Sequence, residues 1–177
     1  MTSQPWLVVI DAQRIFADPG SEWCAPRFAE TLDPIRELVA EHGEGERVVQ
    51  TRWVPPHVKH GSWIPYFERF PFADREQHDP LFDLVEEVAE LRLPYTVSEP
   101  SFGKWGERLR EVVGADAHLV LAGVATDCCV LSTALAASDA GCTVEIAAAA
   151  CAGSDDEAHE RALATMELYA PQITIRR

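Results

Sequence analysis

Positive charge is scarce in this 177-residue sequence, which has 15 Lys and Arg residues against 29 Asp and Glu residues and a formal net charge of −14. No stretch concentrates basic residues, so we expect no nucleic-acid partner. Long apolar runs are also missing, since none reaches the roughly 20 residues that a membrane-spanning helix requires. No basic segment followed by an apolar one opens the chain. These absences predict a cytoplasmic protein without a membrane partner.

Paired cysteines are absent as well. The five cysteines form an odd set without the Cys-x-x-Cys spacing that binds metal. Such a set predicts a reduced, intracellular chain without a disulfide framework. Apolar residues make up 47% of the chain and charged residues 25%, as is ordinary for a globular protein. The length suits one domain, residues 1–177.

Short apolar runs alternate with segments of helical spacing. Residues 6–10, WLVVI, are typical of a strand buried on both faces of a parallel sheet. The alternation predicts a doubly wound α/β fold, a three-layer sandwich around a mostly parallel six-stranded sheet. With strand order 3-2-1-4-5-6, strands 1 and 4 would be neighbours at the topological switch point. Further strands are expected at 47–51, 94–97, 118–122, 143–148 and 173–175, and helices near 27–42, 80–91, 105–113, 126–141 and 154–169. Pro34 indicates a kink or a helix start at Asp33, and Gly43 is an expected helix end.

The stretch 119–141 combines a strand, a tight turn and a helix, which together can hold a nucleophile above the carboxyl edge of a sheet. Thr126 is the expected N-cap, with Asp127 in the first helical turn. Cys128 and Cys129 then lie where backbone N–H groups and the helix dipole favour a thiolate and can receive an oxyanion. The alternative is that these cysteines are small core residues.

Residues 123–130, GVATDCCV, resemble the nucleophile motif of the isochorismatase-like cysteine hydrolases. That superfamily includes nicotinamidases, carbamoylsarcosine amidohydrolases, ureidoacrylate hydrolases and biuret hydrolases. The resemblance covers nearly the whole chain and weakens in its middle. It implies that Cys129 is the nucleophile, that the Val124–Ala125 peptide is cis, that Ala125 and Cys129 N–H groups form the oxyanion hole, and that the protein is a homo-oligomer.

Asp11 directly follows the first expected strand, at the carboxyl edge where open α/β sheets bind ligands. An aspartate in this place is often only a helix cap or turn former. The resemblance of residues 8–13, VVIDAQ, to the superfamily implies that Asp11 is the catalytic aspartate. Gln13 and Phe16 follow it and are expected to line the pocket.

The catalytic lysine of the superfamily has no direct counterpart, because Glu99 holds the place where it is expected. The chain has two lysines, Lys59 and Lys104. Lys104 follows Gly103, whose conformational freedom would let the ammonium reach the same space. We therefore expect Lys104 to complete the triad, the alternative being a solvated lysine at a helix start.

Residues 52–79 are rich in proline and aromatic residues and lack clear periodicity. A stretch of this kind predicts a lid or binding loop, with Trp53, Trp63 and Tyr66 as pocket walls. The alternative is a satellite hydrophobic cluster. Metal-binding nicotinamidases carry Asp-x-His after the second strand, and Trp53-Val54-Pro55-Pro56 lacks these ligands, so we expect no metal.

Together these residues predict a cofactor-free cysteine hydrolase that cleaves a C–N bond in a small amide, ureide or carbamoyl substrate through a thioester. No G-x-G-x-x-G motif or P-loop follows the first strand, so a nucleotide cofactor is not indicated. Three alternatives stay open. They are vinyl ether hydrolysis of the isochorismatase type, a redox role for the Cys128–Cys129 pair, and a non-catalytic binding protein.

Overall fold

The computed structural model describes residues 4–42 and 46–177 and contains one six-stranded parallel sheet. The strand order is β3-β2-β1-β4-β5-β6, the same order assumed for the expected strands. β1 lies between β2 and β4, so the direction of winding reverses beside it. The strands are β1 (Trp6–Ile10), β2 (Val48–Trp53), β3 (Tyr95–Glu99), β4 (His118–Val124), β5 (Thr143–Ala152) and β6 (Ile173–Arg176).

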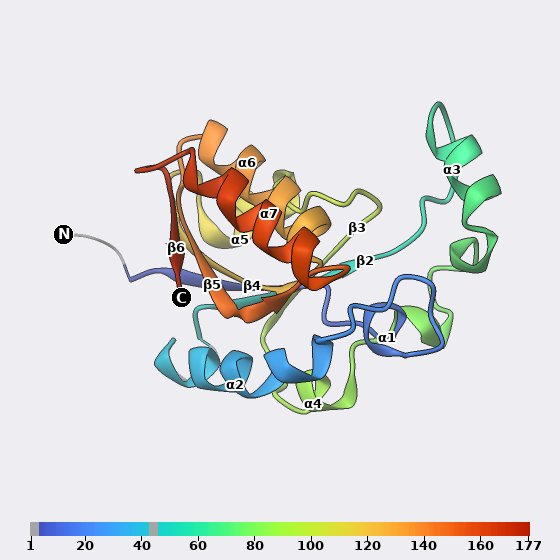
Figure 1. Ribbon diagram of the computed structural model, residues 1–177, viewed down its shortest axis with the longest axis horizontal. Coiled ribbons are helices and arrows are strands. Elements are labelled where there is room, and N and C mark those ends of the chain that lie inside the picture. Colours follow the sequence, from blue (N-terminus) through green and yellow to red (C-terminus); the bar gives the residue numbers. More distant parts are fainter. Residues whose placement is uncertain (1–3, 43–45) are drawn as a thin grey trace.

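Helices cover both faces of the sheet (Figure 1). α5 (Glu107–Val113), α6 (Leu131–Asp139) and α7 (Asp156–Glu167) lie over one face, and α2 (Leu32–Glu41) and α4 (Glu86–Ala89) lie over the other. α1 (Arg14–Ala17) follows β1, and α3 (Trp63–Arg69) lies on an arm at one end of the molecule. A separate apolar core fills the space on each face of the sheet. The three-layer α/β sandwich expected from the sequence is therefore confirmed.

Several expected helices begin or end elsewhere. A 3-10 turn (Phe28–Thr31) precedes α2, which starts at Leu32 and places Pro34 in its first turn instead of starting at Asp33. The predicted helix end at Gly43 lies outside the described residues. The helix expected over 80–91 is wrong: a 3-10 turn (Pro80–Phe82) and the short α4 replace it. Between them, residues 83–85 bond to the backbone of residues 12–14, and such pairing excludes a helix.

The residues after β2 hold more regular structure than the sequence indicated. β2 extends to Trp53, and the arm beyond it contains α3 and a 3-10 turn (Pro71–Ala73). No helix in the described ranges 4–42 and 46–177 is long and apolar enough to cross a membrane.

β4 and β1 approach each other closely at the end that carries the nucleophile turn. Gly123 pairs with Ile10 and has φ +109°, a conformation that side chains with a Cβ rarely adopt. A Cβ at this glycine would lie 2.1 Å from the Ile10 carbonyl oxygen. Gly123 is therefore required both for its backbone conformation and for the space it leaves to β1.

β5 extends to Ala152, beyond the expected strand end at residue 148. Its register with β4 jumps from Leu121–Ile146 to Gly123–Cys151, so residues 147–150 bulge opposite Ala122. After the bulge, Cys151 pairs with Gly123, and Ala152 pairs with Val124. The residues at 151 and 152, expected in a loop, thus extend the sheet beneath the nucleophile turn.

Candidate active site

Asp11 is the first residue after β1 and is completely buried. Its φ of +48° is unusual for a residue with a side chain, although aspartate tolerates this region better than most. Thr51 of β2 fixes it twice, because its hydroxyl donates to Asp11 Oδ1 (2.6 Å) and accepts from the Asp11 N–H (3.2 Å). The carboxylate is thereby held in one orientation at the switch point of the sheet.

Lys104 lies beside Asp11, with its Nζ 3.0 Å from Asp11 Oδ2 and both side chains fully buried. Its ammonium also donates to the Ser101 carbonyl (2.7 Å). Asp11 Oδ2 has no polar partner other than the Lys104 ammonium among the described residues. Glu99, at the position expected for the lysine, lies instead 3.9 Å from Arg108.

The glycine before the lysine has a different role from the one expected. Gly103 does not adopt a positive φ, and a Cβ there would meet Ser132 at an ordinary 3.4 Å. The Ser101 hydroxyl donates to the Gly103 carbonyl (2.7 Å) and closes a turn. Lys104 reaches Asp11 through this turn, without the conformational freedom of glycine.

Cys129 lies in a single π-helical turn, Thr126–Val130, between β4 and α6. The Val124–Ala125 peptide before this turn is cis. Ala125 precedes the turn as its N-cap, so the expected N-cap at Thr126 is shifted by one residue. Ala125 accepts hydrogen bonds from Cys128 and Val130, while its own N–H donates none among the described residues. That N–H is available to an oxyanion.

Both thiols of the turn are perturbed, in opposite directions. A hydrogen bond with Cys128, burial and the Asp11 carboxylate raise the pKa of the Cys129 thiol well above its usual range, and Lys104 opposes them. The hydrogen bond with Cys129 lowers the pKa of the Cys128 thiol. The helix start favours a Cys129 thiolate, and burial beside a carboxylate and a second thiol opposes it. Cys129 rests as a thiol and needs a base.

The turn is anchored on its far side to the loop before α7. Asp127 accepts from the Ser154 N–H (2.8 Å) and from the Ser154 hydroxyl (2.7 Å). The Thr126 hydroxyl lies 2.8 Å from His159 Nδ1. Burial lowers the pKa of His159, so the ring is neutral at pH 7. Thr126 and Asp127 thus anchor the start of the turn that carries both cysteines.

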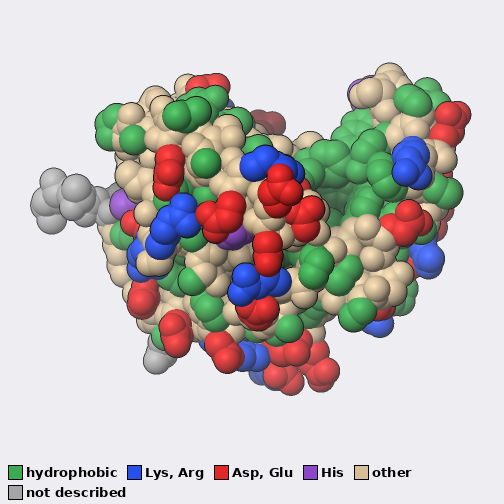
Figure 2. Space-filling view, viewed as in Figure 1, with side chains coloured by type: hydrophobic (Ala, Val, Ile, Leu, Met, Phe, Trp, Pro, Cys, Tyr) green, Lys and Arg blue, Asp and Glu red, His purple; other side chains and the backbone are tan. Residues whose placement is uncertain are grey.

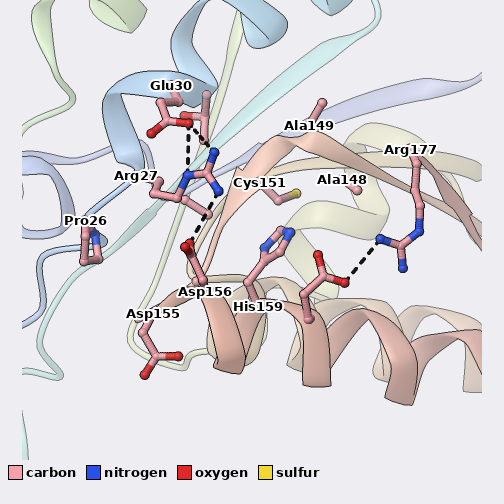
Figure 3. A pocket seen from close by; sticks show the side chains of 14 residues that line it. Pro26, Arg27, Glu30, Ala148, Ala149, Cys151, Asp155, Asp156, His159 and Arg177 are labelled. Carbon is pink, nitrogen blue, oxygen red and sulfur yellow. Dashed lines mark hydrogen bonds and ion pairs between the residues drawn. The ribbon is translucent and has the colours of Figure 1, made fainter.

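A cavity of about 510 Å³ lies behind this anchor, between α7 and the 3-10 turn at Phe28–Thr31 (Figure 3). Arg27 in its wall is paired with Glu30 and Asp156, and Arg177 is paired with Glu160. None of the three predicted catalytic residues lines it. The cavity is therefore separate from the predicted catalytic residues.

An aromatic cluster lies next to the cysteines. Burial, followed by the charges of Cys128 and Cys129, raises the pKa of Tyr66 to about 12, which places this phenol near both thiols. Hydrophobic side chains line a hollow between the body and the arm that carries α3 (Figure 2). The aromatic cluster comprises Phe16, Trp23, Trp53, Trp63, Tyr66, Phe67, Phe70, Phe72, Phe82 and Phe102.

Of the five expected substrate contacts, Trp63 and Tyr66 are partly exposed in this cluster, and three are not. Gln13 is buried and its amide is used by the backbone: Nε2 donates to Trp53 O (2.9 Å) and Phe82 O (2.7 Å), and Oε1 accepts from Trp53 N (2.8 Å). Phe16 and Trp53 are buried in the core against Trp23. These three residues support the wall from behind rather than form its surface.

Sequence reasoning missed several supporting residues. Trp23 stacks or packs edge-on against six rings and is the centre of the aromatic cluster. Phe102, two residues before Lys104, joins the cluster to the lysine turn. Thr51 ends the predicted second strand beside the strand that carries Asp11, and parallel pairing of these strands was the signal that could have revealed it.

The metal-binding element of related nicotinamidases does not fit this chain. Trp53 occupies the start of the corresponding segment and is buried among aromatic rings. Within the described ranges, no group of three or more His, Cys, Asp or Glu side chains could hold a metal ion. Metal independence stays a prediction.

Comparisons with known proteins found solved structures with the same fold. A cysteine hydrolase from Pseudomonas syringae pv. phaseolicola superposes with a TM-score of 0.80 at 17% identity, over 97% of this chain and 88% of that chain. N-carbamoylsarcosine amidase from Thermoplasma acidophilum has a TM-score of 0.74 at 19% identity, over 100% and 96%. Pyrazinamidase of Pyrococcus horikoshii, solved in complex with zinc, has a TM-score of 0.74 at 27% identity, over 98% of both chains. No curated protein sequence matches.

The first two structures share the fold at low sequence identity, and they do not identify a substrate for this chain. The model of the isochorismatase domain matches residues 5–177, which includes every strand of the sheet and every residue of the site described above. The chain belongs to the isochorismatase family.

Proposed function

We propose that this protein is a cysteine hydrolase that cleaves the C–N bond of a small amide, ureide or carbamoyl compound through a thioester. The observation that carries this proposal is the buried Asp11–Lys104 ion pair next to a buried cysteine whose thiol pKa is raised. Because the Cys129 thiol holds its proton in the resting protein, a base must remove that proton before or during the attack of the sulfur. This arrangement supports general-base activation of Cys129.

In the first half of the reaction, Asp11 Oδ2 accepts the Cys129 proton while the sulfur attacks the carbonyl carbon. The N–H groups of Ala125 and Cys129 stabilise the resulting oxyanion. Asp11 then gives the proton to the leaving nitrogen, the C–N bond breaks, and ammonia or an amine departs. Lys104 compensates the negative charge that gathers on the carboxylate and the sulfur.

In the second half, water attacks the thioester carbonyl as Asp11 accepts one of its protons. The C–S bond breaks, the carboxylic acid or carbamic acid leaves, and the proton returns to the Cys129 sulfur. The enzyme is restored without any oxidant, reductant or cofactor. Thr51 keeps the same carboxylate oxygen available in both halves by holding the other one.

The aromatic cluster supports a preference within this substrate class. Trp63, Tyr66 and Phe102 are partly exposed near the cysteines, and their rings offer flat apolar surface to the group that carries the amide. The raised pKa of Tyr66 keeps its hydroxyl protonated and able to donate at neutral pH. Primary amides on flat, uncharged groups are therefore the first compounds to test.

The test measures ammonia release from a panel of amides, ureides and carbamoyl compounds, with trapping of the acyl-enzyme by mass spectrometry. We expect turnover by the native protein, loss of about 10³-fold or more in Cys129→Ala, and turnover retained in the matched variant Cys128→Ala. The acyl group should map to the peptide position of Cys129. Pyruvate release from a vinyl ether, thiol oxidation without turnover, or binding without release would each favour one of the alternative functions and contradict the proposal.

A further inference from the structure

Thr133 joins the main chain of the nucleophile turn to that of the lysine turn. It lies on α6 and is completely buried. Its hydroxyl donates to the Cys129 carbonyl oxygen (2.6 Å) and accepts from the Lys104 N–H (2.9 Å). A hydroxyl has one hydrogen to donate, and that hydrogen is used on Cys129, so the direction of both bonds is determined.

One of these bonds is common, and the other is specific to this arrangement. Threonines in helices often donate to the carbonyl four residues earlier, which by itself indicates no function. The second bond joins residues 29 positions apart. Its donor, the Lys104 N–H, lies in Ser101–Gly106, a segment without helix or strand, and its acceptor lies on α6. The buried Lys104 N–H requires a partner, and Thr133 is the partner it has.

The two ends of the lysine residue are therefore held from two sides. Its ammonium is fixed by Asp11 Oδ2 and the Ser101 carbonyl. Its backbone is fixed by Thr133, which is bonded in turn to Cys129. The distance between Lys104 and the sulfur thus depends on α6 as well as on the sheet.

We propose that Thr133 is a positioning residue that holds Lys104 at the distance from Cys129 at which its charge acts on the thiol. This inference rests on the proposed function for its effect on turnover, but not for its effect on the thiol. Lys104 lowers the pKa of Cys129 against the other groups around it. If the Lys104 backbone drifts, this effect weakens and the thiol becomes harder to ionise.

The experiment compares Thr133→Val, which removes the hydroxyl at constant shape, with Thr133→Ser, which keeps it. Ser138→Ala is the matched control, because Ser138 is also buried on α6 and donates within its helix to the Leu135 carbonyl (3.0 Å), without contact to Lys104. The first readout is the pH dependence of Cys129 alkylation, followed by peptide mapping in a Cys128→Ala background. The second readout is the kcat for the best amide of the panel.

For Thr133→Val we expect the alkylation profile to move to higher pH and kcat to fall by about 10²-fold, the order of loss caused by a small misplacement of a catalytic group. Thr133→Ser should restore both, and Ser138→Ala should change neither. Thr133→Ala supplies the same comparison if Thr133→Val does not fold. An unchanged profile in a folded Val or Ala variant would overturn the inference. A shifted profile in a protein that hydrolyses no amide would support the positioning role and contradict the proposed function.

Discussion

Asp11 and Lys104 are an ion pair without any exposure to solvent, and burying two charges carries a desolvation cost that their attraction often only balances. Such a pair is poor evidence of stabilisation. Its removal one partner at a time is nevertheless costly, because the remaining charge is left buried and uncompensated. Chemistry and stability are therefore coupled at these two residues, and a variant must be assayed for both.

Lys104→Ala should lower turnover by about 10³-fold or more and reduce the free energy of unfolding by about 3 kcal/mol. It should also move the Cys129 thiol titration to higher pH, because Lys104 lowers the pKa of that thiol. Urea unfolding, ammonia release and thiol alkylation measure the three effects. Lys59→Ala is the control, since Lys59 pairs with Asp74 in a partly exposed position, and this change should alter stability by less than about 1 kcal/mol. Equal activity in the two variants would contradict the role of Lys104.

The sequence could place Lys104 in the site, because a second anion beside Asp11 needs a cation and the chain offers only two lysines. The state of the Cys129 thiol could not be predicted in the same way. It depends on the contact with Cys128, on complete burial and on a carboxylate from another strand, all of which arise from tertiary packing. Gln13 was misassigned for a similar reason, since a polar side chain after a strand can serve the backbone as well as a ligand.

At the scale of elements, β1 and β4 approach each other closely at Gly123, behind the site. We predict that Gly123→Ala lowers the free energy of unfolding by about 4 kcal/mol or more, because its Cβ would clash with the β1 backbone in addition to the strained φ. Gly114→Ala separates the two causes, since Gly114 has φ +95° and a Cβ added to it would meet no atom within 4 Å. It should cost about 1–3 kcal/mol, the strain of a side chain in that backbone region. Equal losses in the two variants, measured by chemical denaturation, would show that the close approach is unimportant.

Strands could be predicted within a few residues because fully buried parallel strands appear as continuous apolar runs. The segment 80–91 misled because its apolar residues have helical spacing while its backbone is shared with residues 12–14. The β5 bulge was equally hidden, since a run of alanines contains no signal for a shift in register. The local sequence pattern therefore located the buried strands, and it missed the segments whose backbone conformation depends on contacts with residues distant in the sequence.

At the scale of the whole molecule, the strand order brings Asp11 and the nucleophile turn to one edge, because β1 and β4 are neighbours at the switch point. This part of the site could be predicted from the alternation of strands and helices together with an assumed strand order of 3-2-1-4-5-6. The anchoring of the turn by α7 could not, because Thr126 and His159 are 33 residues apart and neither lies in a recognised motif that would pair them.

That anchor predicts how stability depends on pH. Burial lowers the pKa of His159 in the folded protein, so below about pH 6.5 the unfolded chain binds a proton that the folded chain binds poorly. The contribution of His159 to the free energy of unfolding is present above this pH and is lost as the pH falls through the pKa of His159 in the folded protein. We expect His159→Gln, which does not titrate in this range, to lose less Tm than the native protein between about pH 7.5 and 5.5. An equal loss of Tm in both proteins, measured by thermal unfolding, would exclude His159 as a source of acid sensitivity.

The opposite perturbation of the two adjacent thiols has a consequence for covalent inhibitor discovery. Electrophilic probes react with thiolates, and the thiol with the lowered pKa is Cys128, which is also the more exposed of the two. An electrophilic compound screened against the free protein would therefore modify Cys128 before Cys129. Any loss of turnover would then arise because the modified Cys128 blocks the site, and not because Cys129 has reacted. Amides that the enzyme itself converts slowly to a thioester would instead react with Cys129.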